Sequence, residues 1–126
     1  MYYNCSIVDD EQHAIDALND YIKEIHFLKV TNIFNNPLEA LKTIGNGEKV
    51  DFLFLDIDMA GMAGTELSKC LREKARFVIY ASSNLEHEVR MLDSSFECYL
   101  GKPISMKRFV TSIETIVRLN NLPITN

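Results

Sequence analysis

The sequence predicts one α/β domain in which helices cover both faces of a parallel sheet. Five short apolar runs alternate with longer segments of helical periodicity, the pattern of repeated βα units. The run at residues 52–55 is entirely apolar, as in a central strand buried on both faces. The length of 126 residues suits a single domain, and 47% hydrophobic with 25% charged residues is a globular composition.

The order of the expected elements is (βα)5. We expect strands at residues 4–8, 28–34, 52–55, 77–81 and 98–100, and helices at residues 11–25, 65–73 and 85–92, with another that begins at Pro37 and a last one after Ser105. Asn36 is a suitable N-cap before Pro37, and Gly45 and Gly47 end that helix. Ser105 caps the last helix in the same way.

Apolar side chains at helical spacing indicate which helix faces meet the sheet. The expected inward positions are Ala14, Leu18, Tyr21, Ile22 and Ile25 in the first helix, Leu38, Leu41 and Ile44 in the second, and Phe109, Val110, Ile113, Ile116 and Val117 in the last. Cys5 and Cys98 lie in apolar runs and are expected in the core. Three cysteines, an odd number, argue against a disulfide framework.

Charged residues directly follow three of the predicted strands. Asp9 and Asp10 end the first apolar run, Asp56 and Asp58 end the third, and Lys102 comes after the last. In a parallel α/β sheet the carboxyl ends of neighbouring strands open into one crevice, where ligands bind. Several carboxylates with one ammonium therefore suggest a divalent cation and a phosphoryl group.

The adjacent pair Asp9 and Asp10 is unfavourable by itself, because neighbouring carboxylates repel each other and resist desolvation. A cation removes that penalty, and Mg²⁺ prefers oxygen ligands of the kind that Asp9, Asp10 and Asp56 offer. The alternative for the pair alone is an N-cap followed by an acid that the helix dipole favours. Asp56 at a neighbouring strand end favours the metal site.

Asp56 ends the most hydrophobic strand, so its carboxylate is expected to be fixed at the sheet edge. Carboxylates form aspartyl phosphates when a metal and an ammonium neutralise the phosphoryl charge. Lys102 would supply that ammonium. The alternative is that Lys102 is an ordinary surface lysine in a turn. Pro103 indicates a shaped turn that aims the lysine, with the cis or trans isomer left open.

Two further side chains are expected near the same edge. Ser82 follows the fourth strand and would bond a phosphoryl oxygen once that group is present, as a sensor. An N-cap or turn serine is the alternative, and Ser83 is a rival for either role. Tyr99 is either a core aromatic or a mobile ring on the last strand, and its position alone favours the core.

Together these motifs closely resemble the receiver domain of bacterial two-component response regulators. The matching segments are Ile7-Val8-Asp9-Asp10-Glu11, Phe54-Leu55-Asp56-Ile57-Asp58-Met59 with Gly64, Ala81-Ser82, and Tyr99-Leu100-Gly101-Lys102-Pro103-Ile104. The resemblance covers residues 3–120. It implies a flavodoxin-like fold with a five-stranded parallel sheet of order 2-1-3-4-5.

The resemblance also implies a role for each residue at the sheet edge. Asp56 is then the phosphoacceptor, and Lys102 contacts its phosphate. The implied Mg²⁺ ligands are Asp9, Asp10, Asp56 and the backbone carbonyl of Asp58. Ser82 takes the position of the switch hydroxyl and Tyr99 that of the switch aromatic, which replaces the core interpretation of Tyr99.

The implied function is to accept a phosphoryl group from a sensor histidine kinase, with Mg²⁺ and without enzymatic turnover. Phosphorylation would change the face formed by residues 85–92, residues 98–100 and the last helix. That face would then dimerise or release an output domain.

Finer details resemble receivers of the LytTR class. These details are Phe54-Leu55-Asp56-Ile57-Asp58-Met59, Tyr99-Leu100, and Lys102-Pro103-Ile104-Ser105 followed by Arg108-Phe109. Such receivers usually precede a LytTR DNA-binding domain, so we expect residues 1–126 to be the isolated receiver of a transcription regulator. Ala60, Ser83 and Gly101 depart from the usual pattern, but none of them is a phosphorylation residue.

Two alternatives stay open. Residues 54–58 also resemble the first motif of haloacid-dehalogenase-type phosphohydrolases, although in that family the motif lies near the N-terminus and the paired acids come late. A stand-alone receiver that serves in a phosphorelay or as an interaction module is the other alternative. A module that is never phosphorylated would normally lack an acid or the lysine, and all are present here.

Charge and hydropathy indicate which partners and which location we expect for the domain. A formal net charge of -5, with no basic cluster beyond Lys107-Arg108, argues against direct nucleic-acid binding, so DNA contact would need a C-terminal domain absent here. The N-terminus does not resemble a secretory signal, and no apolar stretch is long enough to span a bilayer. We therefore expect a cytoplasmic protein without membrane contact.

Overall fold

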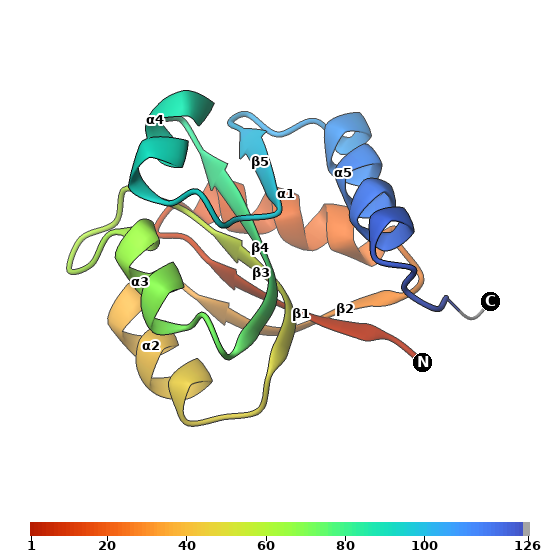
Figure 1. Ribbon diagram of the computed structural model, residues 1–126, viewed down its shortest axis with the longest axis horizontal. Helices are drawn as coiled ribbons and strands as arrows, with labels where there is room; N and C mark the ends of the chain where they lie inside the picture. The colour runs from red at the N-terminus through yellow and green to blue at the C-terminus, as the bar shows by residue number, and fades with distance from the viewer. Residues whose placement is uncertain (125–126) are drawn as a thin grey trace.

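The computed structural model describes residues 1–124 as a five-stranded parallel sheet with helices on both faces (Figure 1). The strands are β1 (Tyr3–Val8), β2 (Leu28–Phe34), β3 (Val50–Leu55), β4 (Ala75–Ser82) and β5 (Cys98–Gly101), and the helices are α1 (Gln12–Lys23), α2 (Pro37–Gly45), α3 (Gly64–Cys70), α4 (Glu86–Leu92) and α5 (Met106–Leu119). The strand order is β2-β1-β3-β4-β5. This confirms the predicted flavodoxin-like (βα)5 fold.

The helices divide into two layers, each with its own hydrophobic core (Figure 1). α1 and α5 cover one face, where the rings of Phe54 and Phe109 stack with centroids 5.5 Å apart. α2, α3 and α4 cover the other, where Leu53 and Leu55 belong to the second core. Successive β3 side chains point to opposite faces, so an uninterrupted apolar run supplies both cores, as the sequence predicts.

The predicted helix caps are confirmed. Asn36 Oδ1 accepts a hydrogen bond of 2.8 Å from the Leu38 amide, with Pro37 in the first turn of α2. Ser105 Oγ accepts a hydrogen bond of 3.2 Å from the Arg108 amide at the start of α5. These bonds satisfy amide groups that have no partner within the helix.

Two expected inward positions do not face the core. Leu38 is 51% exposed, because α2 turns the row Pro37, Ala40 and Ile44 towards the sheet. In α1 the buried residue of the first turns is Ile15, and Ala14 is only half-buried. Spacing alone did not separate these neighbouring rows of side chains.

The two ends of the described chain are joined at the end of the sheet where the strands begin. Tyr3 Oη donates a 2.6 Å hydrogen bond to the carbonyl oxygen of Pro123, and Leu122 is buried beneath it in the first core. The start of β1 and the end of α5 lie on the same side of the molecule in Figure 1. Within the described residues, no helix has the length and apolar character needed to cross a membrane.

Candidate functional site

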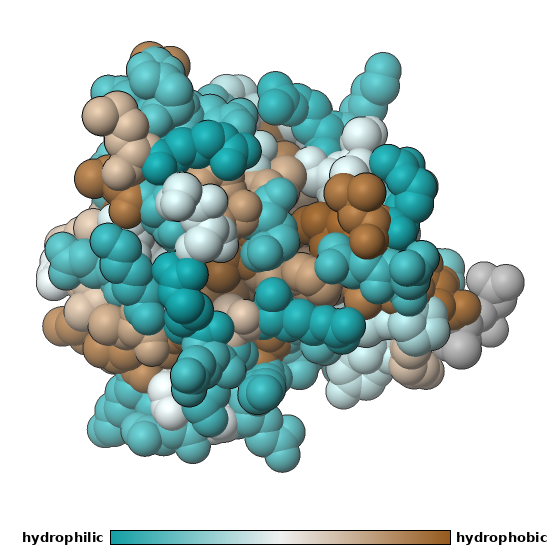
Figure 2. Space-filling model, in the orientation of Figure 1, coloured by the Kyte–Doolittle hydropathy of each residue, from teal (hydrophilic) through white to brown (hydrophobic). Residues whose placement is uncertain are grey.

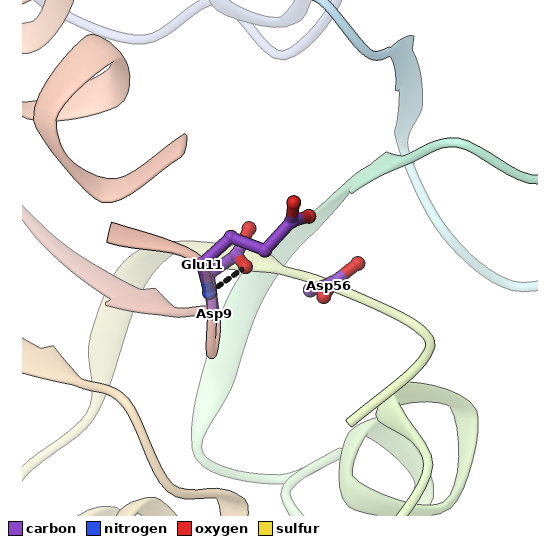
Figure 3. Close-up of side chains that lie close together, drawn as sticks. All are labelled: Asp9, Glu11 and Asp56. Atoms are coloured by element: carbon purple, nitrogen blue, oxygen red, sulfur yellow. Dashed lines mark hydrogen bonds between the residues drawn. The ribbon is translucent and has the colours of Figure 1, made fainter. Parts of the chain in front are cut away.

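Three carboxylates meet at the carboxyl ends of β1 and β3. Asp9 follows β1, Glu11 immediately precedes α1 and Asp56 follows β3, and one ligand oxygen of each lies within 4.8 Å of the others (Figure 3). β1 and β3 are neighbours, and the Asp56 amide donates a 2.9 Å hydrogen bond to the Val8 carbonyl. The pairing of these two strands therefore brings Asp9 and Asp56 side by side.

Lys102 reaches the same place from the end of β5. Its amide donates a 2.8 Å hydrogen bond to the Ser82 carbonyl, and the peptide bond to Pro103 is cis. Its Nζ lies 2.6 Å from Glu11 Oε1, 3.0 Å from Asp9 Oδ2 and 3.5 Å from Asp56 Oδ1. Burial disfavours the ammonium, but these carboxylates outweigh it and raise the pKa of Lys102. Lys102 is therefore a fixed positive charge in the site.

The surroundings of Asp56 disfavour its ionised form. Its side chain is only 6% exposed, and Oδ1 accepts a 2.9 Å hydrogen bond from the Ile57 amide. Burial, followed by repulsion from Asp9, raises the pKa of Asp56 to about 7, although Lys102 acts in the opposite direction. The site therefore contains more negative charge than one lysine neutralises.

The residues present fit a divalent cation. Asp9 is 1% exposed, and its Oδ1 accepts a 2.9 Å hydrogen bond from the Glu11 amide. Its Oδ2 is buried without a hydrogen bond, although it is in ion-pair contact with Lys102. An under-coordinated carboxylate oxygen among three acids is a suitable ligand for a hard cation such as Mg²⁺.

Two of the acids that the sequence singled out lie outside this cluster. The side chains of Asp10 and Asp58 are exposed, and neither belongs to the group formed by Asp9, Glu11 and Asp56. The roles of Asp10 and of the Asp58 carbonyl remain predictions. Glu11 was not among the predicted site residues, although it follows Asp9 and Asp10 directly and so lies at the same sheet edge.

Ser82 and Tyr99 are connected through Asn84. Ser82 is 1% exposed at the end of β4, and its Oγ donates a 2.6 Å hydrogen bond to Asn84 Oδ1 and accepts one of 3.0 Å from the Asn84 amide. The half-buried Tyr99 donates to the carbonyl oxygens of Ser82, at 3.2 Å, and of Asn84. Ser83, the rival of Ser82, is exposed. The hydroxyl and the aromatic ring thus share one loop.

Gly64 allows the backbone to pack tightly behind Asp56. Its amide donates a 2.8 Å hydrogen bond to the Ile57 carbonyl, and a Cβ atom here would collide with the carbonyl oxygen of Asp56. Only glycine fits this close approach. The first residue of α3 therefore holds the loop that carries Asp56.

Known proteins resemble this chain over most of its length. A response regulatory protein of Yersinia pestis, described as uncharacterized, is 30% identical over 113 residues, which cover 89% of this chain and 47% of the relative. The transcriptional regulatory protein YpdB of Escherichia coli is 27% identical over 112 residues, which cover 87% of this chain and 46% of the relative. The chain therefore spans about half the length of these curated relatives.

A solved structure shows the same fold. The signal receiver domain of a modulated diguanylate cyclase from Desulfovibrio desulfuricans G20 superposes with a TM-score of 0.81 at 22% identity, covering 97% of this chain and 98% of the other. The sequence model of the response regulator receiver domain matches residues 5–114, which include the acids, Ser82 and Lys102. With this match added to the fold, the chain belongs to the response regulator receiver domain family.

Proposed function

We propose that this receiver domain accepts a phosphoryl group on Asp56 from a partner histidine kinase, with Mg²⁺ bound by the acids beside it. The observation that supports this most directly is a buried carboxylate, that of Asp56, whose Oδ1 lies 3.5 Å from the ammonium nitrogen of Lys102. A nucleophile and a compensating charge are what phosphoryl transfer to a carboxylate needs. The domain then acts as a signalling component of a two-component system, and not as an enzyme.

In the proposed step, a carboxylate oxygen of Asp56 forms a bond to phosphorus while the bond from phosphorus to the kinase histidine nitrogen breaks. The imidazole leaves with the electron pair, and Lys102 neutralises the phosphoryl oxygens. The proposed Mg²⁺ ligands are Asp9, Asp10, Asp56 and the Asp58 carbonyl, of which Asp9 and Asp56 belong to the observed cluster. Bound Mg²⁺ would supply charge neutralisation for the transfer.

The loop between β4 and α4 offers a way to sense the product. The Ser82 hydroxyl proton is now donated to Asn84 Oδ1, and a phosphoryl oxygen on Asp56 would compete for it. Asn84 would then lose one of its bonds to Ser82, and Tyr99 is bonded to the carbonyl of Asn84. The proposed switch therefore passes from Ser82 through Asn84 to Tyr99.

The proposed output face is formed by α4, β5 and α5. Figure 2 shows apolar residues at the surface over α4, among hydrophilic ones, and Leu85, Met91 and Leu92 are between 57% and 84% exposed. We propose that this face mediates homodimer formation after phosphorylation. Since the chain spans about half the length of its curated relatives, one of which is a transcriptional regulator, we propose a LytTR-type DNA-binding domain as the output.

The test is phosphorylation of the isolated receiver domain in vitro. The wild-type protein and Asp56→Asn are incubated with Mg²⁺ and either acetyl phosphate or beryllofluoride, then followed by intact mass and amide NMR. In the wild type only, we expect acetyl phosphate to add the mass of one phosphoryl group. Either reagent should change the NMR chemical shifts of the Ser82 and Tyr99 amides in the wild type and not in the variant. A wild-type protein that neither gains mass nor changes its spectrum would contradict the proposal. Steady multiple-turnover release of phosphate from small phosphate esters would also contradict it and would favour a haloacid-dehalogenase-type phosphohydrolase.

A further inference from the structure

Lys102 Nζ lies closest to Glu11, and not to the proposed phosphoacceptor. The Nζ to Glu11 Oε1 distance is 2.6 Å, whereas Nζ is 3.5 Å from Asp56 Oδ1. Asp9 Oδ2 lies between these two, at 3.0 Å. Glu11 therefore holds the ammonium more closely than the other two acids do.

Glu11 differs from the other acids in how firmly it is fixed. Its side chain is 58% exposed, whereas Asp9 and Asp56 are almost fully buried. It occupies the N-cap position of α1 but makes no side-chain capping bond, and its carboxylate accepts the hydrogen bond from Lys102 instead. An exposed carboxylate at the rim of the site is suited to release the lysine.

From this geometry we propose that Glu11 is a positioning residue that competes with the phosphoryl group for Lys102. While Asp56 is unphosphorylated, Glu11 draws the ammonium towards the rim of the site, and the incoming phosphoryl oxygens must displace it. The competition slows phosphorylation and weakens phosphoryl mimics. This inference rests on the proposed function and adds a control on its rate.

Two variants separate this role from a general effect of charge. Glu11→Gln removes the competing charge. Glu11→Asp keeps the charge, but its side chain is one methylene shorter. An aspartate at the N-cap accepts hydrogen bonds from the amides of the first helical turn, so its carboxylate also moves away from Lys102. The reaction measured is phosphorylation by acetyl phosphate at saturating Mg²⁺, in which an Asp56 oxygen bonds to phosphorus and acetate leaves with the electron pair.

We expect both variants to react about two- to fivefold faster than the wild type, the effect of losing one partly exposed ion pair. The affinity for beryllofluoride, measured by NMR titration, should rise by a similar factor. Unfolding curves serve as the control for structure. Acceleration in Glu11→Gln alone would identify a general charge effect and overturn the proposal. No acceleration in either variant would also overturn it. That includes the case in which both variants need more Mg²⁺ because Glu11 is a metal ligand.

The outcome for the wild type separates the two proposals. A wild-type protein that is phosphorylated on Asp56 while neither Glu11 variant is faster contradicts the role of Glu11 alone. A wild-type protein that never reacts contradicts the proposed function, and this inference with it.

Discussion

Asp56 illustrates at the residue scale how a reactive group lowers the stability of the fold that holds it. Burial and the neighbouring Asp9 raise the pKa of Asp56 to about 7, whereas an aspartate in an unfolded chain has a pKa of about 3.9. Between these pH values the folded state binds a proton that the unfolded state has lost. The folded protein therefore loses stability from this group as the pH rises from about 4 to 7.

Asp56→Asn removes this ionisation and should stabilise the metal-free protein. At pH 8 we expect the free energy of unfolding to rise by about 1 to 4 kcal/mol, with the gain disappearing near pH 4. Urea unfolding between pH 4 and 8 measures it. Added Mg²⁺ should stabilise the wild type more than the variant, because a cation binds the ionised acids. If the two proteins have equal free energies of unfolding across the pH range, ionisation of Asp56 does not destabilise the fold and the prediction is wrong.

Gly64 is the second residue whose substitution has a clear physical consequence. In Gly64→Ala the new methyl group would collide with the carbonyl oxygen of Asp56, so the loop must shift. We expect a loss of about 1 to 3 kcal/mol in unfolding free energy and slower phosphorylation with acetyl phosphate.

The matched control for this substitution is Gly45→Ala, at the end of α2, where a Cβ atom meets nothing within 4 Å. Alanine is the better helix former, so that variant should be as stable as the wild type or slightly more so. If Gly64→Ala unfolds like Gly45→Ala, the close approach behind Asp56 does not restrict residue 64.

The sequence predicted which residues meet at the site better than it predicted their surroundings. Strand ends placed Asp9, Asp56 and Lys102 at one edge, and the structure brings them together. Glu11 was missed because an acid before a helix has an ordinary explanation in the helix dipole. Asn84 was missed because its contacts depend on the course of a loop, which residue types alone do not determine.

At the element scale, α4 stands out as weakly held by apolar contacts. Val89 is its only buried residue, and the polar side chain of Asp93, next to its last turn, is buried instead. Asp93 accepts hydrogen bonds from Tyr80 Oη at 2.6 Å and from the Ser95 amide at 2.9 Å. Although burial opposes it, these bonds lower the pKa of Asp93, so a carboxylate anchors the helix.

Tyr80→Phe should loosen this anchor. The substitution keeps the buried ring but leaves a lone pair of Asp93 without its donor, at a cost of about 1 to 3 kcal/mol. Hydrogen exchange of the α4 amides should become faster. Tyr2→Phe, at a tyrosine that is 51% exposed, is the control and should leave exchange unchanged. Unchanged α4 exchange in Tyr80→Phe would mean that Val89 alone holds the helix.

The existence and order of the elements were predictable, whereas the exact faces of the helices were less so. Caps at Asn36 and Ser105 identified two helix starts, and the alternation of apolar runs identified the sheet. In α2, Leu38 is three residues from Leu41, whereas Ala40 is four residues from Ile44, so the sequence offers two neighbouring rows of apolar side chains. The packing of the helix on the sheet buries the row with Ala40 and leaves Leu38 at the surface.

At the scale of the whole molecule, the exposed apolar side chains predict where copies associate. Met91, on α4, is 84% exposed, and charge there should oppose a contact between two copies. We expect Met91→Glu to reduce dimer formation by the beryllofluoride-treated domain in sedimentation velocity. Leu38→Glu, at an exposed leucine on α2, adds the same charge and should leave the dimer intact. Equal effects of the two variants would argue against a specific α4 face.

The hydrogen bond between Tyr3 and Pro123 has a consequence for how the domain is used. β1 runs from Tyr3, next to Pro123, to Val8, beside the acids, and six residues of strand span roughly 20 Å. A segment joined beyond α5 would therefore leave from the end opposite Asp56. Such a segment starts about one strand length away from the acids, so it is joined to the domain at a place separate from the chemistry.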